Sequence, residues 1–310
     1  MAPLLAFVLS SALFAAALRL AMPIFFAALG ETFAERAGLV NVGLEGMMLA
    51  AAFGSVLGSY GTGDPVLGLG VGVLCGMAVA AVQAAVAIRL AGDQVVGGIA
   101  LNLAVLGLTS FLARFVWPAG RVPQVPGFGT VAIPVLADVP VVGRILFAQN
   151  VLVYLALVLG VVSWWLLTRT IWGLRLRACG EDPRSCDSLG ISVPRMRWAS
   201  MLLCGALASV GGVFISLGEL DTFTDGMTGG RGFIALAVVI VARWSPSRLI
   251  LAALLFGGCE AVAFRAQALN VGVPYELLLA LPYVVTLLVY AGVVGRVVPP
   301  AALGRPYASL

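Results

Sequence analysis

Several polar residues interrupt apolar segments of this chain, and their types and spacing suit the binding of a small polar molecule. Asn41 and Glu45 lie four residues apart, so a helix would place both on one face. Glycines flank them and would let a neighbouring helix or a solute approach the backbone closely. Because a charge inside a membrane is normally paired or faces a cavity, Glu45 is expected to pair with a buried arginine, for example Arg231, or to contact a solute.

Two amides form a second polar pair on one predicted helix. Gln94 and Asn102 are eight residues apart, which turns both side chains roughly the same way. Their amide groups could bind the edge of a base or sugar, or join two helices, and both interpretations stay open. Phe223 could likewise stack on an aromatic solute or pack in the interior. The candidate residues of a solute pathway are Asn41, Glu45, Gln94, Asn102, Phe223 and Arg231.

Other charged residues lie in the second half of the chain. Glu219, Asp221 and Asp225 precede a Gly-Gly pair, and they could meet a basic patch on a partner protein or simply solvate a loop. Glu260 and Arg265 are five residues apart, which is a poor spacing for a pair on one helix. Each is therefore expected to have its partner on another element.

Arginines and a short capped helix mark the segment 171–197, which is the predicted cytoplasmic loop. Asp182 is a good N-cap, and the following Pro183 suits the first helical position. Gly190 suits the left-handed residue that ends a helix. The segment is either an ordinary arginine-rich loop or a docking element for a cytoplasmic protein, and its candidate docking residues are Asp182, Pro183, Arg184, Asp187 and Gly190.

Composition excludes several other kinds of site. The chain has no histidine and no lysine, so it holds neither a histidine-based catalytic pair nor a GxxxxGK[ST] phosphate loop. Its five cysteines show no CxxC spacing, and we expect no metal site, no disulfide framework and no cofactor. No catalytic residue is predicted, and a net charge of +4 does not argue for a nucleic-acid partner.

The elements that position these residues are transmembrane helices. The chain is 61% hydrophobic and 10% charged, with a mean hydropathy of +1.08, so the lipid bilayer must solvate much of its surface. A span needs about 20 apolar residues. We predict an all-α transmembrane bundle of about nine to ten spans that forms one domain over 1–310, with nine segments at Leu4–Leu29, Leu39–Gly58, Val66–Ile88, Val95–Val116, Val151–Thr168, Trp198–Leu217, Phe233–Ala242, Leu249–Phe264 and Leu277–Val294.

Arginine placement predicts the orientation of the bundle. The arginine cluster between Arg169 and Arg197 should remain cytoplasmic. The Pro/Gly-rich loop 118–150 then lies on the extracytoplasmic side, as does the N-terminus. Two stretches, Gly38–Leu108 and Met227–Val289, share a Gly-rich polar start and would enter from opposite sides, which predicts an inverted-topology repeat.

Three long motifs resemble a known family. GETFAERAGLVNVGLEGMMLAAAFGS (Gly30–Ser55), GEDPRSCDSLGI (Gly180–Ile191) and MTGGRGFIALAVVI (Met227–Ile240) are similar to permease subunits of bacterial ABC importers for branched-chain amino acids, ribose-type sugars and nucleosides. The greatest similarity is to the shorter permease of nucleoside importers. The family's coupling helix carries a Glu-Ala-Ala…Gly pattern, and this chain has Arg184-Ser185-Cys186…Gly190 instead.

The resemblance implies a non-enzymatic transport subunit in the bacterial cytoplasmic (inner) membrane. Its implied partners are a cytoplasmic ABC ATPase, a second permease in a heterodimer, an extracytoplasmic solute-binding lipoprotein and a small-molecule solute such as a nucleoside. The residues alone leave an alternative open, because inverted repeats with the intramembrane Glu45 and Glu260 also fit a transporter driven by an ion gradient.

Overall fold

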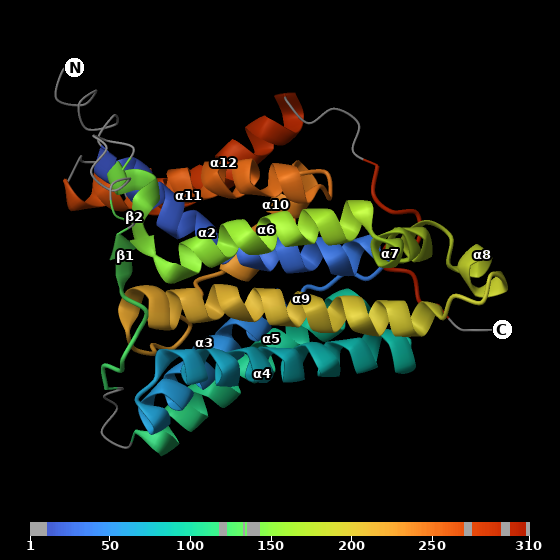
Figure 1. Ribbon diagram of the computed structural model, residues 1–310, viewed down its shortest axis with the longest axis horizontal. Coiled ribbons are helices and arrows are strands. Elements are labelled where there is room, and N and C mark those ends of the chain that lie inside the picture. The colour runs from blue at the N-terminus through green and yellow to red at the C-terminus, as the bar shows by residue number, and fades with distance from the viewer. Residues whose placement is uncertain are drawn as a thin grey trace.

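In the computed structural model the long helices lie side by side in one bundle (Figure 1). The structure describes residues 11–117, 123–132, 134, 143–269, 275–292 and 298–307. Two short helices, α7 and α8, lie at one end of the bundle, here named the α8 end, and a small two-stranded sheet lies at the opposite end, the strand end. The predicted cytoplasmic segment and the predicted outer loop therefore occupy opposite ends.

The helices follow the apolar segments of the sequence. Their bounds are α2 Ser11–Arg36, α3 Leu44–Thr62, α4 Pro65–Ala84, α5 Gln94–Val116, α6 Val151–Arg169, α7 Ile171–Glu181, α8 Pro183–Ser188, α9 Val193–Ile215, α10 Arg231–Val241, α11 Pro246–Ala268 and α12 Tyr275–Gly292. Three π-helical turns follow or join them: η1 Ala85–Arg89, η2 Gly143–Phe147 and η3 Ser216–Leu220.

Each of the nine predicted segments overlaps one of these helices, and the chain is a multi-pass membrane protein. Within the described residues, six helices are long and apolar enough to cross a bilayer: α2, α4 with η1, α5, α6, α9 with η3, and α11. The helix α10 has only eleven residues and cannot cross alone. The total of nine to ten spans and the inverted repeat remain predictions.

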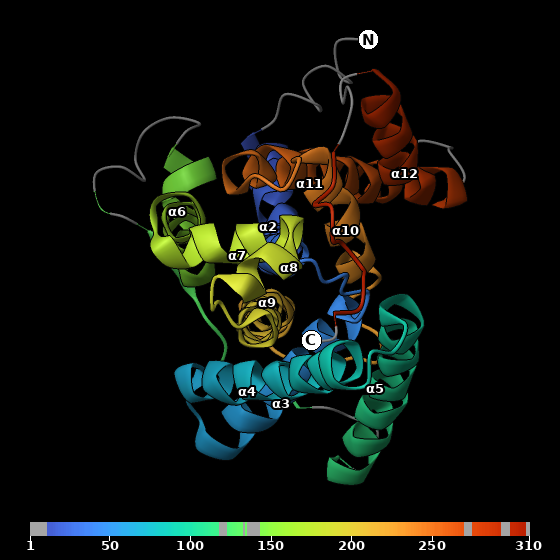
Figure 2. The ribbon, with the colours of Figure 1, turned by 90° about the vertical axis from the view of Figure 1, so that its right-hand side faces the viewer.

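The core of the bundle is built around α2 and α9, which pack against each other (Figure 2). Figure 2, seen from the α8 end, shows α9 end-on, with α3 and α4 on one side of it and α2 and α6 on the other. Small residues allow this close packing. A Cβ on Gly30 of α2 would lie 2.6 Å from the carbonyl oxygen of Cys204 on α9, so a larger residue would separate the two helices.

The first two helices end later than predicted, and α3 also begins later. The helix α2 continues to Arg36, and the part of the predicted first span before Ser11 lies outside the described residues. The chain is then non-helical over residues 37–43, and α3 starts only at Leu44. Asn41 therefore precedes the helix that carries Glu45, and the prediction that both share one helical face was wrong.

The described part of the outer loop adds a feature that the all-α prediction lacked. Strand β1, Thr130–Ala132, pairs antiparallel with β2, Ala148–Asn150, at the strand end. The amide N–H of Phe128 donates to Leu217, and the Ser59 hydroxyl donates to Pro126, at 2.7 Å each. These bonds hold the loop against the ends of α3 and η3. Residues 118–122, 133 and 135–142 of this loop lie outside the described residues.

Candidate functional site

Side chains of α5 satisfy the non-helical backbone before α3. The Val40 N–H donates to Oε1 of Gln94 at 2.7 Å. Asn102 accepts from the Gly46 N–H at 2.8 Å and donates to the Val42 carbonyl at 2.9 Å. An unpaired backbone group in a membrane interior costs several kcal/mol, so this arrangement makes the break in the helix tolerable. Gln94 and Asn102 are both buried and join two elements.

Asn41 lies within the non-helical segment 37–43 and also satisfies its backbone groups. Its N–H donates to the carboxylate of Glu31 on α2 at 2.9 Å, and its side-chain oxygen accepts from the Gly43 N–H at 3.1 Å. Its amide nitrogen faces the sulfur atoms of Met47 and Cys204 at 3.4 and 3.3 Å. Asn41 is fully buried, so its polar atoms fix the segment 37–43 in this conformation.

Glu45 binds the start of α10. Its carboxylate accepts from the Thr228 hydroxyl at 2.6 Å and from the N–H groups of Gly230 and Gly232 at 2.8 Å each. The expected pairing with the Arg231 side chain is therefore wrong. The physical reason is that the first N–H groups of a helix have no partner within it and carry partial positive charge, so they suit a carboxylate.

The helices α3 and α10 both begin at this contact, which we name the α3–α10 junction. A Cβ on Gly232 would lie 2.5 Å from the backbone nitrogen of Glu45, so only glycine allows the approach. From here α3 runs to the strand end, where Ser59 binds the outer loop, and α10 runs to the α8 end, where Trp244 follows it. The helices α3 and α10 thus diverge from one polar contact within the bundle.

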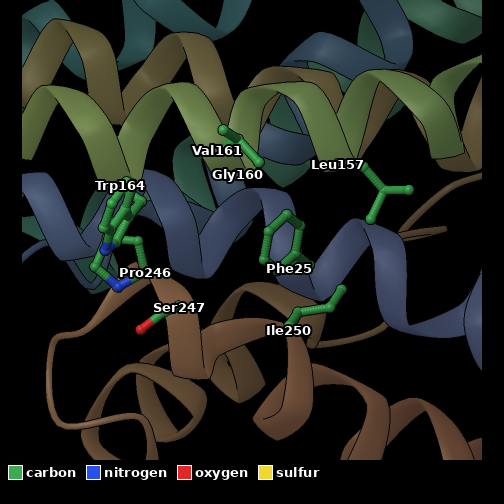
Figure 3. A pocket seen from close by; sticks show the side chains of 8 residues that line it. All are labelled: Phe25, Leu157, Gly160, Val161, Trp164, Pro246, Ser247 and Ile250. Atoms are coloured by element: carbon green, nitrogen blue, oxygen red, sulfur yellow. The ribbon is translucent and has the colours of Figure 1, made fainter.

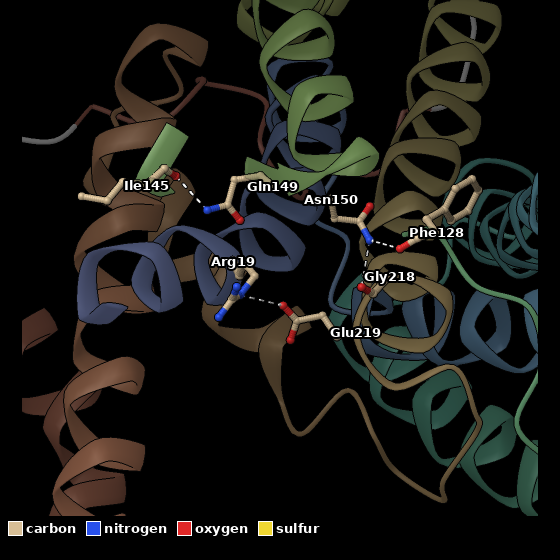
Figure 4. Close-up of polar contacts among 7 residues, drawn as sticks. All are labelled: Arg19, Phe128, Ile145, Gln149, Asn150, Gly218 and Glu219. Atoms are coloured by element: carbon tan, nitrogen blue, oxygen red, sulfur yellow. Dashed lines mark hydrogen bonds and ion pairs between the residues drawn. The ribbon is translucent and has the colours of Figure 1, made fainter. Parts of the chain in front are cut away.

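Two ion pairs lie on the strand side of the junction. Arg231 pairs with Glu260 of α11 at 3.0 Å, and both side chains are largely buried. Glu260 therefore has its partner on another element, as expected. Arg19 of α2 lies 3.9 Å from Glu219 (Figure 4), so Glu219 contacts α2 while it remains exposed. Figure 4 also shows Asn150 donating to the carbonyls of Phe128 and Gly218 and so attaching the outer loop to η3.

Phe223 is a packing residue in this conformation. Its ring is buried and meets the Phe53 ring edge to face, with centroids 5.4 Å apart. The Phe53 ring also contacts Trp117 at 5.9 Å. Of the six candidate pathway residues, Glu45 and Arg231 alone are partly exposed, and the other four (Asn41, Gln94, Asn102 and Phe223) are buried.

At the α8 end the predicted helix start is present. Asp182 accepts from the N–H groups of Arg184 and Ser185 at 3.1 and 3.2 Å, and Pro183 is the first residue of α8. A hydrogen bond from the Ser185 hydroxyl and those from the backbone lower the pKa of the Asp182 carboxyl. This cap is therefore complete at neutral pH and weakens only as pH falls through that lowered value. Gly190 has φ +76°, as a left-handed helix end requires.

The segment 298–307 forms a clamp around α7 that no pattern in the sequence predicted. The Ala302 N–H donates to Gly180 at 2.9 Å, and the Gly304 N–H donates to Gly38 at 3.1 Å. Arg197, 1% exposed, donates to the carbonyls of Ala37 and Arg305. We call this set of contacts the C-terminal clamp. It joins the α7–α8 segment to the start of the non-helical segment 37–43.

A second missed contact joins α2 to the turn after α10. The indole N–H of Trp244 donates to the Glu35 carboxylate, and the Arg36 guanidinium donates to the Trp244 carbonyl at 3.2 Å. Glu31 and Glu35 lie one turn apart in an apolar segment. That spacing was a signal in the sequence for a buried polar contact.

Comparison with known proteins agrees with this architecture. Residues 13–291 match the family described as the branched-chain amino acid transport system permease component. The chain is 37% identical to the guanosine ABC transporter permease protein NupQ of Bacillus subtilis, with 93% of each chain covered. It is 36% identical to the nucleoside ABC transporter permease protein NupC of Lactococcus lactis, covering 92% of this chain and 93% of NupC.

Two further relatives are also named as permease proteins of ABC transporters. A permease protein named for a glucose ABC transporter, TsgC13 of Haloferax volcanii, is 39% identical over 82% of this chain and 78% of its own. The guanosine ABC transporter permease protein NupP of Bacillus subtilis is 25% identical over 82% of this chain and 72% of its own. The match over most of the chain and the identity to NupQ show that this chain belongs to the branched-chain amino acid transport system permease family and is the permease subunit of an ABC importer.

Proposed function

We propose that this permease carries nucleosides across the bacterial cytoplasmic (inner) membrane together with a second, different permease. The full-length similarity to NupQ and NupC supports nucleosides as the solute class. NupQ and NupP of Bacillus subtilis are both named as guanosine ABC transporter permease proteins, which supports a heterodimer. An ABC ATPase at the α8 end and a solute-binding lipoprotein at the strand end complete the proposed assembly.

The α3–α10 junction is the observation that carries the proposed pathway. Glu45, Arg231 and Glu260 are all partly exposed on one side of the bundle, within apolar helices. Charged groups at such a depth face water or protein, because lipid does not solvate them. The side formed by α5 and α10 is therefore proposed to face the second permease, with the solute passing between the two subunits.

The ATPase would couple ATP hydrolysis to the permease at the α8 end. The short helix α8 is proposed to dock into the ATPase through Asp182, Pro183, Arg184, Asp187 and Gly190. Leu189 is 78% exposed there, which leaves an apolar side chain free for a partner protein. The C-terminal clamp would then transmit movement of α7 and α8 to Gly38 and hence to the segment before α3.

A sugar is the second candidate solute, because TsgC13 is as similar to this chain as NupQ is. Uptake into vesicles that contain the whole transporter separates the two candidates. We expect ATP-dependent uptake of labelled guanosine or uridine that unlabelled nucleosides block and glucose does not. Uptake of glucose without nucleoside uptake would assign the transporter to sugars, and uptake driven by an ion gradient without ATP would contradict an ABC mechanism.

Two arginine variants, one at the proposed solute pathway and one control, test the position of the pathway. Arg231→Gln should lower nucleoside uptake by roughly tenfold, because it removes a charge from the proposed path and leaves Glu260 unpaired. Arg243→Gln removes an exposed arginine from the turn after α10 and should transport normally. Normal uptake by the Arg231 variant would place the solute path elsewhere.

A further inference from the structure

The outer surface of the bundle carries a groove between α2, α6 and α11, on a different side from the α3–α10 junction (Figures 2 and 3). Its volume is about 270 Å³. Phe25, Leu157, Val161 and Ile250 make its wall apolar. The neighbouring side chains of α6 are exposed, with Val158 at 57% and Val161 at 65%, so this face meets the hydrocarbon of the bilayer.

One end of the groove is chemically different from the rest. Figure 3 shows Trp164, Pro246 and Ser247 together at that end, and Leu157 at the other. Trp164 lies five residues before the end of α6, and Ser247 lies in the first turn of α11, so this is the end towards α7 and α8. Tryptophan prefers this depth, where the hydrocarbon meets the headgroups.

Two arginines lie at the same end of the groove. The Arg169 guanidinium lies over the Trp164 ring, 5.7 Å from its centroid, and Arg169 is exposed. Arg248 follows Ser247 and is exposed as well. Within the described residues no acidic side chain lines the groove. The groove therefore joins an apolar channel for a chain to a rim with positive charge and a hydroxyl donor.

We propose that the groove binds one anionic phospholipid of the cytoplasmic leaflet, with an acyl chain along Phe25 and Leu157 and its phosphate near Arg169, Ser247 and Arg248. The charge complementarity at the rim selects the occupant, since arginines near an anionic membrane surface attract its headgroups. A zwitterionic lipid would fill the apolar part equally well but would gain less at the rim.

Native mass spectrometry of the full-length chain with added phosphatidylglycerol or phosphatidylcholine tests this site. Phosphatidylglycerol should bind more tightly to the natural protein. In the double variant Arg169→Gln/Arg248→Gln its affinity should fall by about 30-fold, as two arginines near an anionic headgroup imply, and phosphatidylcholine binding should not change.

Arg89→Gln is the matched control. Arg89 also stacks on a tryptophan, Trp198, at 5.3 Å, but neither residue lines the groove. This variant should bind phosphatidylglycerol normally. Equal binding of the two lipids by the natural protein, or an equal loss in the Arg89 variant, would show that the lipid responds only to general charge and would overturn the proposal.

A groove-filling variant tests the acyl-chain part. Val161→Trp adds volume at an exposed position, so the fold should be retained, and lipid binding should fall with the arginines intact. The melting temperature of the variant checks folding. If Val161→Trp instead blocks association with the second permease and leaves lipid binding unchanged, the groove is a protein interface and the lipid assignment is wrong.

Discussion

At the scale of single residues, polar side chains in this permease mostly stabilise irregular backbone. Asn41, Gln94 and Asn102 bind N–H and carbonyl groups of the segment before α3. Glu45 does the same for the start of α10. A transporter needs breaks in its helices, and each break leaves backbone groups that lipid cannot satisfy. Side-chain amides and carboxylates replace the missing partners.

Glu45 gives the residue-scale prediction. Glu45 accepts from Gly230 through Oε1 and from Gly232 through Oε2. Glu45→Gln replaces one of these oxygens with an NH2 group that faces one of the two N–H donors, so it should lower the free energy of unfolding by about 1–3 kcal/mol. Denaturant titration in detergent, followed by tryptophan fluorescence, measures the change. Asp225→Asn alters an exposed residue before the same helix and should have no effect. Equal stability of both variants would contradict a structural role for the Glu45 carboxylate.

At the scale of elements, short helices matter as much as full spans. The helix α10 is too short to cross the bilayer, and α8 has only six residues. Such helices are only marginally stable in isolation, so their stability depends on capping residues and on packing against the rest of the bundle. The side of α8 that faces the bundle packs Cys186 against Cys179 and Val193. Its position is therefore fixed while its outer residues stay exposed.

The cap of α8 gives the element-scale prediction. Asp182→Ala removes the N-cap and should destabilise α8 locally. If α8 is the docking element, ATP hydrolysis by the whole transporter should continue while nucleoside uptake falls. Asp182→Asn should keep both activities, because asparagine is an equally good cap.

A matched control exists at the strand end of the bundle. Asp64 caps α4 in the same way, with Pro65 as its first residue and a 2.8 Å bond from the Val66 N–H. Asp64→Ala should leave uptake and hydrolysis coupled. If Asp64→Ala and Asp182→Ala reduced coupling equally, the effect would reflect general destabilisation, and the docking role of α8 would lose its support.

At the scale of the whole molecule, the C-terminal clamp connects parts that are distant in sequence. Arg197 contacts Ala37 and Arg305, and Gly180 lies against both Arg36 and Ala302. The clamp brings the end of α2, the end of α7 and the start of α9 together at the α8 end. Movement of α7 should therefore reach the α3–α10 junction through the segment 37–43.

Arg197 gives the prediction at this scale. Arg197→Gln should lose the bonds to the carbonyls of Ala37 and Arg305 and lower the free energy of unfolding by about 1–3 kcal/mol. It should also reduce uptake relative to ATP hydrolysis. Arg195→Gln, an exposed arginine on the same helix, should change neither quantity. A drop in stability without any change in coupling would limit the clamp to a structural role.

Several features of the candidate site followed from local sequence patterns. The cap at Asp182 and the left-handed Gly190 depend on neighbouring residues alone, and the structure confirmed both. The spacing of Glu260 and Arg265 indicated a distant partner for Glu260, which proved to be Arg231. The partner predicted for Glu45 was wrong, because the free N–H groups at a helix start bind a carboxylate as well as a guanidinium does. The hydrophobic periodicity of the sequence also does not show where α10 begins.

The membrane-spanning class, the approximate positions of the apolar helices and the family follow from the amino-acid sequence, because apolar length, caps and long motifs are properties of contiguous residues. Which polar groups meet depends on the tertiary packing. Glu45 lies about 185 residues from its partners and Arg197 about 160 from Ala37, so their contacts depend on how α2, α3, α9 and α10 pack. Glycines such as Gly30 and Gly232 set that packing through close approaches that a linear pattern cannot specify.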